Sequence, residues 1–246
     1  MRSFLAAAGF LTQFPVPGRP TPRALAAAPG YFPAVGLLIG ALLAALTTGL
    51  QPWLPPAVLA AVVILTLLAI TGGLHIDGLA DTCDGFFAAA SSPLRRLEIM
   101  RDSRVGGFGV AGVTSVLLLQ YAALSSLPAR AWPPALLLMG VQSRWAVALV
   151  LLAFPYGRGQ GMGLAFKQGH IIPSVLGGTL FALGASLLVA GPFGGLAMLA
   201  TAAASLLAGR LLLVRLPGLT GDSYGAINEG AQAVVLVVAA AAAHVA

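Results

Sequence analysis

The stretch Gly72-Gly73-Leu74-His75-Ile76-Asp77-Gly78-Leu79-Ala80-Asp81-Thr82-Cys83-Asp84-Gly85 holds three of the seven acidic residues in this 246-residue chain. In a helix, Asp77, Asp81 and Asp84 would share one face, because they are spaced at i, i+4 and i+7. Carboxylates about 5 Å apart repel each other by roughly 3 kcal/mol at an effective dielectric constant near 20. A hard cation with oxygen ligands, such as Mg²⁺, would relieve that repulsion. The alternative is that the aspartates cap helices or pair with nearby arginines.

The composition around this stretch is that of an integral membrane protein. Hydrophobic residues make up 59% of the chain and charged residues only 8%, and the mean hydropathy is +0.95. Soluble domains carry about 25% charged residues. We therefore predict an all-α fold, a polytopic membrane helix bundle that forms one domain over residues 1–246.

About seven segments are long and apolar enough to span a bilayer, which takes about 20 residues each. Six or eight spans remain alternatives, because the fifth and sixth segments are interrupted by glycines. Residues 1–30 are expected to lie at the cytoplasmic interface. The predicted spans are 31–50, 57–74, 106–127, 133–154, 174–190, 194–212 and 226–245.

Basic residues orient these spans. With seven spans, eleven of the thirteen fall on one side, Arg130 alone falls in a loop on the other, and Arg144 lies within the fourth span. This asymmetry predicts that the basic side faces the cytoplasm; the cytoplasmic (inner) membrane as the location is implied by the family resemblance described below. The eleven are Arg2, Arg19, Arg23, Arg95, Arg96, Arg101, Arg104, Arg158, Lys167, Arg210 and Arg215.

All seven acidic residues fall on the same cytoplasmic side, which predicts a single site there. The arginines are spread over short loops without interleaved aromatic residues, so topology explains the net charge of +6 better than nucleic-acid binding does. A single cysteine, Cys83, excludes an intramolecular disulfide.

Two further stretches carry ionisable residues. Leu97–Gly106 contains Glu98, Arg101, Asp102, Ser103 and Arg104. Its arginines are suited to bidentate phosphate binding, and an ordinary ion-paired loop is the alternative. Thr220–Glu229 contains Asp222, Asn228 and Glu229. An acid inside an apolar segment is costly and by default functional, which applies to Glu229.

Isolated polar residues give weaker signals. Arg144 costs roughly 2.5–3.5 kcal/mol at the centre of a spanning helix, so it should face the bundle and meet a carboxylate or a phosphate. His75 either binds substrate or starts a helix, and we assign no role to His170 or His244. The loop Gly157–Gly163 is a lid or a linker. The GxGxxG match at Gly107–Gly112 follows no strand, which favours close helix packing, and Gly36 and Gly40 favour the same.

At this point the residues resemble a known family. The aspartate stretch is similar to the signature of cobalamin synthases, and so are three others that follow the family's order along the chain. The further stretches are Phe10–Pro17, Met100–Gly106 and Gly221–Ala226. The chain departs from the family's usual residues at Gln13, where arginine is common, and at Ser223-Tyr224, where a smaller Thr-Leu pair is expected.

The resemblance implies an adenosylcobinamide-GDP ribazoletransferase. Such an enzyme uses Mg²⁺ to join adenosylcobinamide-GDP to α-ribazole or its 5′-phosphate, and it releases GMP. The ribose 3′-hydroxyl attacks the phosphate nearer to cobinamide. The implied partners are these substrates and the lipid bilayer, with no nucleic acid. A second copy of the chain and other enzymes of corrinoid synthesis are further candidate partners.

The residues and the resemblance together give the expected site. The catalytic residues would be Asp77, Asp81, Asp84, Asp222 and Glu229. The substrate-binding residues would be His75, Arg101, Asp102, Ser103, Arg104, Arg144 and Asn228. The Mg²⁺ ligands would come from Asp77, Asp81, Asp84, Glu98, Asp102 and Asp222.

Two other functions are alternatives to this prediction. A CDP-alcohol phosphotransferase has similar chemistry, but its DGxxAR pattern is broken here because Asp81 follows Ala80. A divalent-cation or proton-coupled transporter would place its acids near the middle of the membrane, whereas these acids gather at one face.

Overall fold

The computed structural model describes residues 1–167 and 171–245, so His170 lies outside the described residues. The described chain is helical, with one isolated bridge between Tyr156 and Leu219 in place of any strand. This confirms the predicted all-α class. The helices are α1 (Arg2–Leu11), α2 (Pro22–Ala27), η1 (Ala28–Tyr31), α3 (Phe32–Leu50), α4 (Pro56–Thr71), α5 (Leu74–Phe87), α6 (Pro93–Ile99), α7 (Gly107–Ser126), η2 (Ala129–Ala131), α8 (Trp132–Ala153), α9 (Met162–Lys167), α10 (Ile171–Leu213) and α11 (Gly221–Val245).

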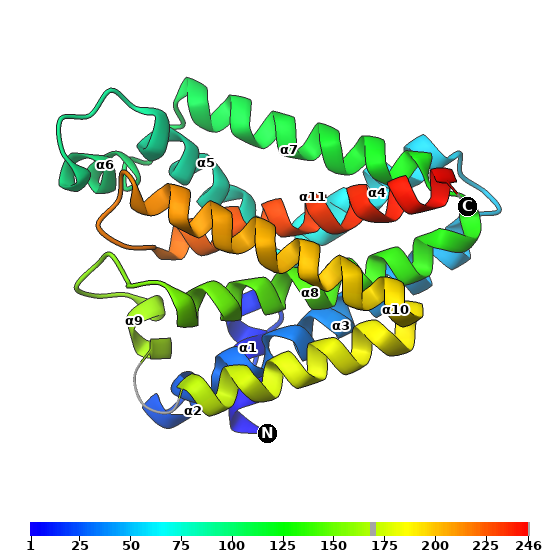
Figure 1. The fold of residues 1–246 in the computed structure, drawn as a ribbon, viewed down its shortest axis with the longest axis horizontal. Helices are drawn as coiled ribbons and strands as arrows, with labels where there is room; N and C mark the ends of the chain where they lie inside the picture. Colours follow the sequence, from blue (N-terminus) through cyan, green and yellow to red (C-terminus); the bar gives the residue numbers. More distant parts are fainter. Residues whose placement is uncertain (168–170, 246) are drawn as a thin grey trace.

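The long helices run roughly side by side as a bundle (Figure 1). Five of the described helical segments are long and apolar enough to cross a membrane, or six when α4 and α5 are taken as one bent span. The helix α10 is interrupted at Ala190 and Gly191, whose dihedral angles are not helical. Its two halves fold back on each other (Figure 1), and they match the two predicted spans 174–190 and 194–212. The predicted count of about seven is therefore approximate.

Glycines allow the central helix α8 to approach α3 closely. A Cβ atom added at Gly36 would overlap the carbonyl of Gly140, and one at Gly40 would meet the backbone of Leu136. In a bilayer, small residues let helix backbones meet and gain van der Waals contact. The prediction that Gly36 and Gly40 form a packing face is confirmed.

The chain bends sharply between α4 and α5. Gly72 and Gly73 both adopt positive φ, +62° and +71°, a conformation that glycine reaches without steric cost. The two helices meet at 91°. The helix predicted for the aspartate stretch is present as α5, and the bend turns it across the end of the bundle towards α7 and α11.

The N-terminal helix α1 packs against the helices of the bundle. Ala7 and Leu11 of α1 are fully buried, and the ring of Phe10 lies 4.8 Å from that of Phe166 and 5.9 Å from that of Phe32. The backbone amide of Gln13 donates a hydrogen bond to the backbone carbonyl of Ile70. The N-terminal segment therefore packs next to the bend between α4 and α5.

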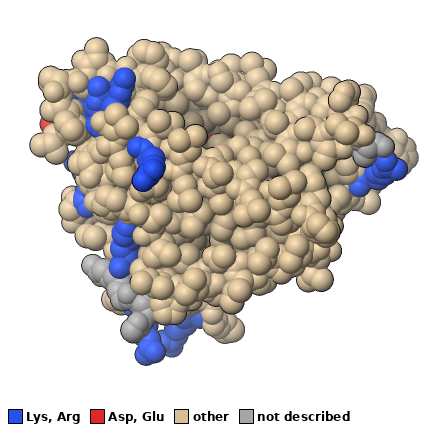
Figure 2. All heavy atoms as spheres, in the orientation of Figure 1, with Lys and Arg blue, Asp and Glu red and all other residues tan. Residues whose placement is uncertain are grey.

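Charged side chains gather at one end of the molecule. Figure 2 shows most of the visible lysines and arginines at the end that carries α6 and α9, while the sides of the bundle are almost free of charge. Arg96 holds this end together, since it donates to the carbonyls of Gly85, Phe86 and Ala88 at the C-terminus of α5.

Candidate functional site

The site is built where α5 crosses α11. A Cβ atom at Gly78 would lie 2.8 Å from the carbonyl oxygen of Asp222, and one at Gly225 would lie 3.0 Å from that of His75. Only glycine permits this approach, which brings the first turn of α11 against the aspartate face of α5. Asp222 thereby joins Asp77 and Asp81 although it is distant in sequence.

These three carboxylates act on one another electrostatically. Burial acts most strongly on the ionisation of Asp81, and the charges of Asp222 and Asp77 come next. Asp77 is exposed, while Asp81 and Asp222 are half-buried. The structure therefore brings together three acids that the sequence predicted, two from α5 and one from α11.

Asp84, the third acid of the stretch, has a different local role. One of its oxygens accepts a hydrogen bond from the amide of Gly106 at 2.7 Å, and the other accepts from the amide of Gly109 at 2.8 Å. These amides lie at the N-terminus of α7, where a carboxylate stabilises the helix dipole. Gly109 and Gly112 also let α7 approach Asp84 and Cys83 closely, as expected for the small-residue interpretation of Gly107–Gly112.

Arg158 provides the positive charge beside the carboxylates, and it was not among the site residues predicted from the sequence. Its Nη2 atom lies 2.8 Å from Oδ2 of Asp222, with 15% and 22% of the two side chains exposed. Its Nε atom is buried and has no hydrogen-bond partner among the described residues. The glycines on either side of Arg158 in the Gly157–Gly163 loop were the sequence feature that could have pointed to this residue.

Backbone contacts hold this loop against the start of α11. The amide of Gly157 donates to Leu219 at 2.8 Å, and the amide of Leu219 donates to Pro155 at 2.9 Å. The rings of Tyr156 and Tyr224 stack, with centroids 6.4 Å apart. Burial raises the pKa of Tyr156, so its phenol stays protonated at neutral pH. Tyr224 is one of the residues that depart from the family pattern, and it forms part of the wall.

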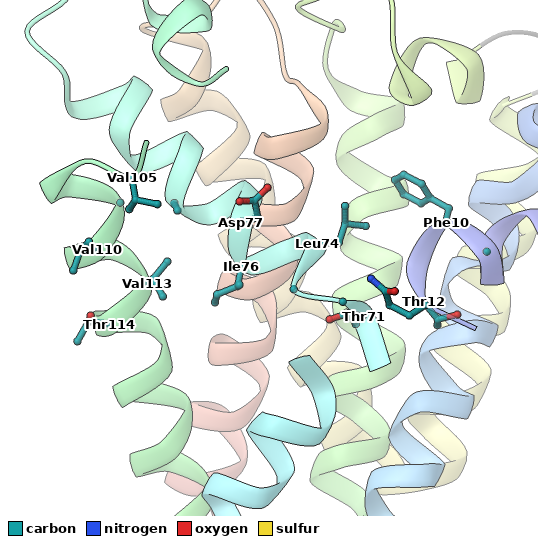
Figure 3. A pocket seen from close by; sticks show the side chains of 16 residues that line it. Phe10, Thr12, Thr71, Leu74, Ile76, Asp77, Val105, Val110, Val113 and Thr114 are labelled. Atoms are coloured by element: carbon teal, nitrogen blue, oxygen red, sulfur yellow. The ribbon is translucent and has the colours of Figure 1, made fainter. Parts of the chain in front are cut away.

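Two cavities meet at these residues. A narrow cavity of about 300 Å³ is lined by His75, Asp77, Arg101, Arg158, Asp222 and both tyrosines. A wider one of about 900 Å³ lies between α1, α5 and α7, and Figure 3 shows Asp77 between Val105 on one side and Phe10 on the other. Phe10, Leu74 and Asp77 line both cavities.

Of the site residues predicted in the 97–106 stretch, one lines a cavity and the others lie on the surface. Arg101 lines the narrow cavity. Glu98 instead pairs with Arg95 at 2.7 Å on the surface, and Ser103 is exposed. Asp102 pairs with Arg104 at 2.7 Å, and hydrogen bonds from Arg104 hold the pKa of this carboxyl at about 2. The structure therefore places Glu98, Asp102, Ser103 and Arg104 outside the two cavities.

A second polar group lies deeper in the bundle. Arg144 is fully buried and Glu229 is 4% exposed, and their charges interact. Glu229 accepts hydrogen bonds at 3.0 Å from Gln120 and from Gln232, which the sequence analysis did not select. Asn228 is buried next to Glu229. Neither Arg144 nor Glu229 lines the two cavities described above.

His75 lies between the two groups. It is 4% exposed and lines the narrow cavity, and it lies within the electrostatic influence of Arg144. Its Nδ1 atom has no hydrogen-bond partner among the described residues. His75 therefore combines contact with the cavity and a buried nitrogen that has no partner in the described part of the chain.

The donor set at the crossing suits Mg²⁺ only with help from a ligand. Among the described residues, no three His, Cys, Asp or Glu side chains converge closely enough to hold a metal ion by themselves. Mg²⁺ commonly uses one or two carboxylates and takes its other oxygens from water and substrate phosphates. Asp77 and Asp81 meet that lesser requirement, with Asp222 beside them.

Comparison with known proteins agrees with the resemblance seen in the sequence. The profile of the family described as cobalamin-5-phosphate synthase matches residues 3–240. The chain is 37% identical to an adenosylcobinamide-GDP ribazoletransferase of Acetivibrio thermocellus, covering 96% of both chains. It is 41% identical to the enzyme of that name in Ectopseudomonas mendocina, covering 93% of this chain and 94% of the other. No solved structure gives a significant match.

Proposed function

The chain belongs to the cobalamin-5-phosphate synthase family, and from this premise we propose that it transfers a phosphocobinamide group from adenosylcobinamide-GDP to α-ribazole or α-ribazole 5′-phosphate. A hydroxyl of the ribazole attacks the phosphorus nearer to cobinamide. A new P–O bond forms, the P–O bond to the leaving phosphate breaks, and GMP departs. As a member of this family, the chain is a transferase of cobalamin biosynthesis.

The observation that carries the proposal is the cavity in which Asp77 and Asp222 lie beside Arg101 and Arg158. Phosphoryl transfer depends on positioning and on neutralising charge at the phosphates. One donor group of Arg158 is paired with Asp222, and its buried Nε, which has no partner among the described residues, would donate to a phosphate oxygen. Arg101 supplies a second guanidinium.

The carboxylates serve the other side of the reaction. Asp77, exposed in both cavities, is placed to orient the attacking hydroxyl and to accept its proton. A Mg²⁺ ion bound there would neutralise charge that develops on the phosphates. Asp77 and Asp81 would hold it, and Asp222 would add a third carboxylate nearby.

We place this site on the cytoplasmic side of the inner membrane. The proposal rests on the basic residues, which gather at the end that carries α6 and α9 (Figure 2), as the positive-inside rule requires of a cytoplasmic end. A reporter fused next to Arg95 should then be cytoplasmic, and one fused after the last residue should be periplasmic. Both reporters in one compartment would contradict this orientation.

The activity is tested with the purified full-length chain in liposomes. Adenosylcobinamide-GDP and Mg²⁺ are supplied with α-ribazole in one series and with its 5′-phosphate in another, and GMP and the cobamide product are measured. We expect GMP and the cobamide product to form in equal amounts, and we expect no reaction without Mg²⁺. GMP without cobamide would indicate hydrolysis, and no GMP from either acceptor would refute the proposed function.

A further inference from the structure

The two cavities that meet at Asp77 differ in size and chemistry in a way that matches the two halves of a corrinoid nucleotide. This inference rests on the proposed function and extends it to substrate binding. The reacting diphosphate of adenosylcobinamide-GDP joins a large corrin ring with neutral amide side chains to a much smaller charged nucleotide. A site that cleaves this linkage must accommodate both halves on opposite sides of one point.

The wider cavity has the properties required for the corrinoid half. Its volume of about 900 Å³ is three times that of its neighbour, and Asp77 is the only charged residue among the described residues that line it. Val105 and Val113 project towards it from one side, and Phe10 and Thr12 border it from the other (Figure 3). Apolar walls with a few small polar groups suit a bulky ligand that carries little charge for its size.

The narrow cavity has the opposite character. Two guanidinium groups, Arg101 and Arg158, line its volume of about 300 Å³. A guanidinium fits phosphate in bidentate fashion, and the ring of Tyr156 offers a face for a nucleobase. These features suit GMP, which leaves the reaction with an additional negative charge.

We infer that the wide cavity between α1, α5 and α7 binds the cobinamide half of the substrate, that the arginine-lined cavity binds the GMP half, and that Asp77 marks the position of the diphosphate between them. Phe10 and Leu74 form the remaining shared wall.

The test uses two ligands that each represent one half, adenosylcobinamide without nucleotide and GMP. Their dissociation constants are measured by equilibrium dialysis with the full-length chain in nanodiscs. Val113→Trp and Val105→Trp fill the wide cavity from α7 and from the preceding loop. Leu118→Trp is the matched control, because Leu118 lies on α7, is 61% exposed and does not line the cavity.

We expect both cavity-filling variants to weaken adenosylcobinamide binding about tenfold, since an added indole cannot share the space, and to leave GMP binding within about twofold. Arg101→Gln should weaken GMP binding about tenfold, the usual scale of a lost charged hydrogen bond. It should leave adenosylcobinamide unaffected. Arg95→Gln is its control, because Arg95 pairs with Glu98 on the surface.

The reverse pattern, or corrinoid binding in Val105→Trp and Val113→Trp equal to that in Leu118→Trp, overturns the inference. Val105 lies in an exposed loop, so that variant remains informative if Val113→Trp does not fold. The proposed function fails separately, when the unmodified chain forms no GMP from adenosylcobinamide-GDP and ribazole. Intact turnover with unaltered corrinoid binding would reject the assignment of the cavities alone.

Discussion

Two groups of polar side chains follow each other along α11, and they differ in what they face. Asp222, in the first turn, meets Arg158 at the wall of a cavity. Glu229, seven residues later, is enclosed with Gln120, Gln232 and the charge of Arg144. A charge at a cavity is available to a ligand, whereas an enclosed charge must be balanced inside the protein. An acid within an apolar segment is therefore not sufficient evidence for ligand contact.

The largest expected effect is on the stability of the enclosed group. Glu229→Leu would leave Arg144 buried without a carboxylate and would remove the acceptor of Gln120 and Gln232. Leaving a buried charge without the carboxylate that balances it costs about 3–5 kcal/mol. The melting temperature in detergent, followed by tryptophan fluorescence, should fall clearly, and less protein should accumulate in the membrane.

Turnover per folded molecule tests whether the two groups are independent. It should stay within about threefold of the unmodified chain, and Arg144→Met combined with Glu229→Leu should recover most of the lost stability. A large loss of turnover at normal stability would show that the enclosed group acts on the site, and His75 is the residue that could transmit the effect.

At the cavity, the expected effect is on catalysis. Asp77→Asn keeps the size of the side chain and removes its charge, so kcat should fall about 10²-fold or more, the scale of one lost electrostatic group at a reacting centre. Membrane accumulation should be normal. Because groups that act as a unit are not additive, adding Asp81→Asn should cost little more. Normal turnover and Mg²⁺ dependence in both variants would exclude this face as the catalytic centre.

Arg158 should have a smaller effect, because Arg101 remains in the same cavity. Arg158→Gln removes the ion pair with Asp222 and one phosphate donor, and we expect kcat/KM to fall about tenfold. Arg158→Lys should recover only part of this loss, since an ammonium group cannot serve Asp222 and a phosphate in the same geometry. Full recovery by lysine would reduce Arg158 to a source of general positive charge.

The sequence predicted the helices better than it predicted the site. Apolar length predicted the spans, and glycine spacing predicted a packing face on α3, because both depend on local composition. That this face meets α8 is known only from the structure. The orientation of Asp84 depends on α7, and the position of Arg158 depends on backbone contacts between two loops. The sequence also could not separate Asp222 from Glu229, because the partners of Glu229 on α7 and α8 are distant along the chain.

The smallest expected effect concerns Asp102, which the sequence assigned to metal and substrate and which the structure places in an exposed pair with Arg104. Its pKa of about 2 lies below the usual value for an aspartate. The carboxylate is therefore fully charged at neutral pH, and it becomes protonated only as the pH falls towards 2. Asp102→Asn should therefore change kcat/KM by less than about threefold, the scale of an exposed ion pair, with an unaltered pH profile from about 6 to 9. Arg101, its neighbour, already lines the narrow cavity, so closure of this loop over a substrate would carry Asp102 inwards. A loss of kcat/KM as large as that expected for Asp77→Asn would show that the loop closes in this way. The charged residues that line the narrow cavity would then gain a further carboxylate when substrate binds.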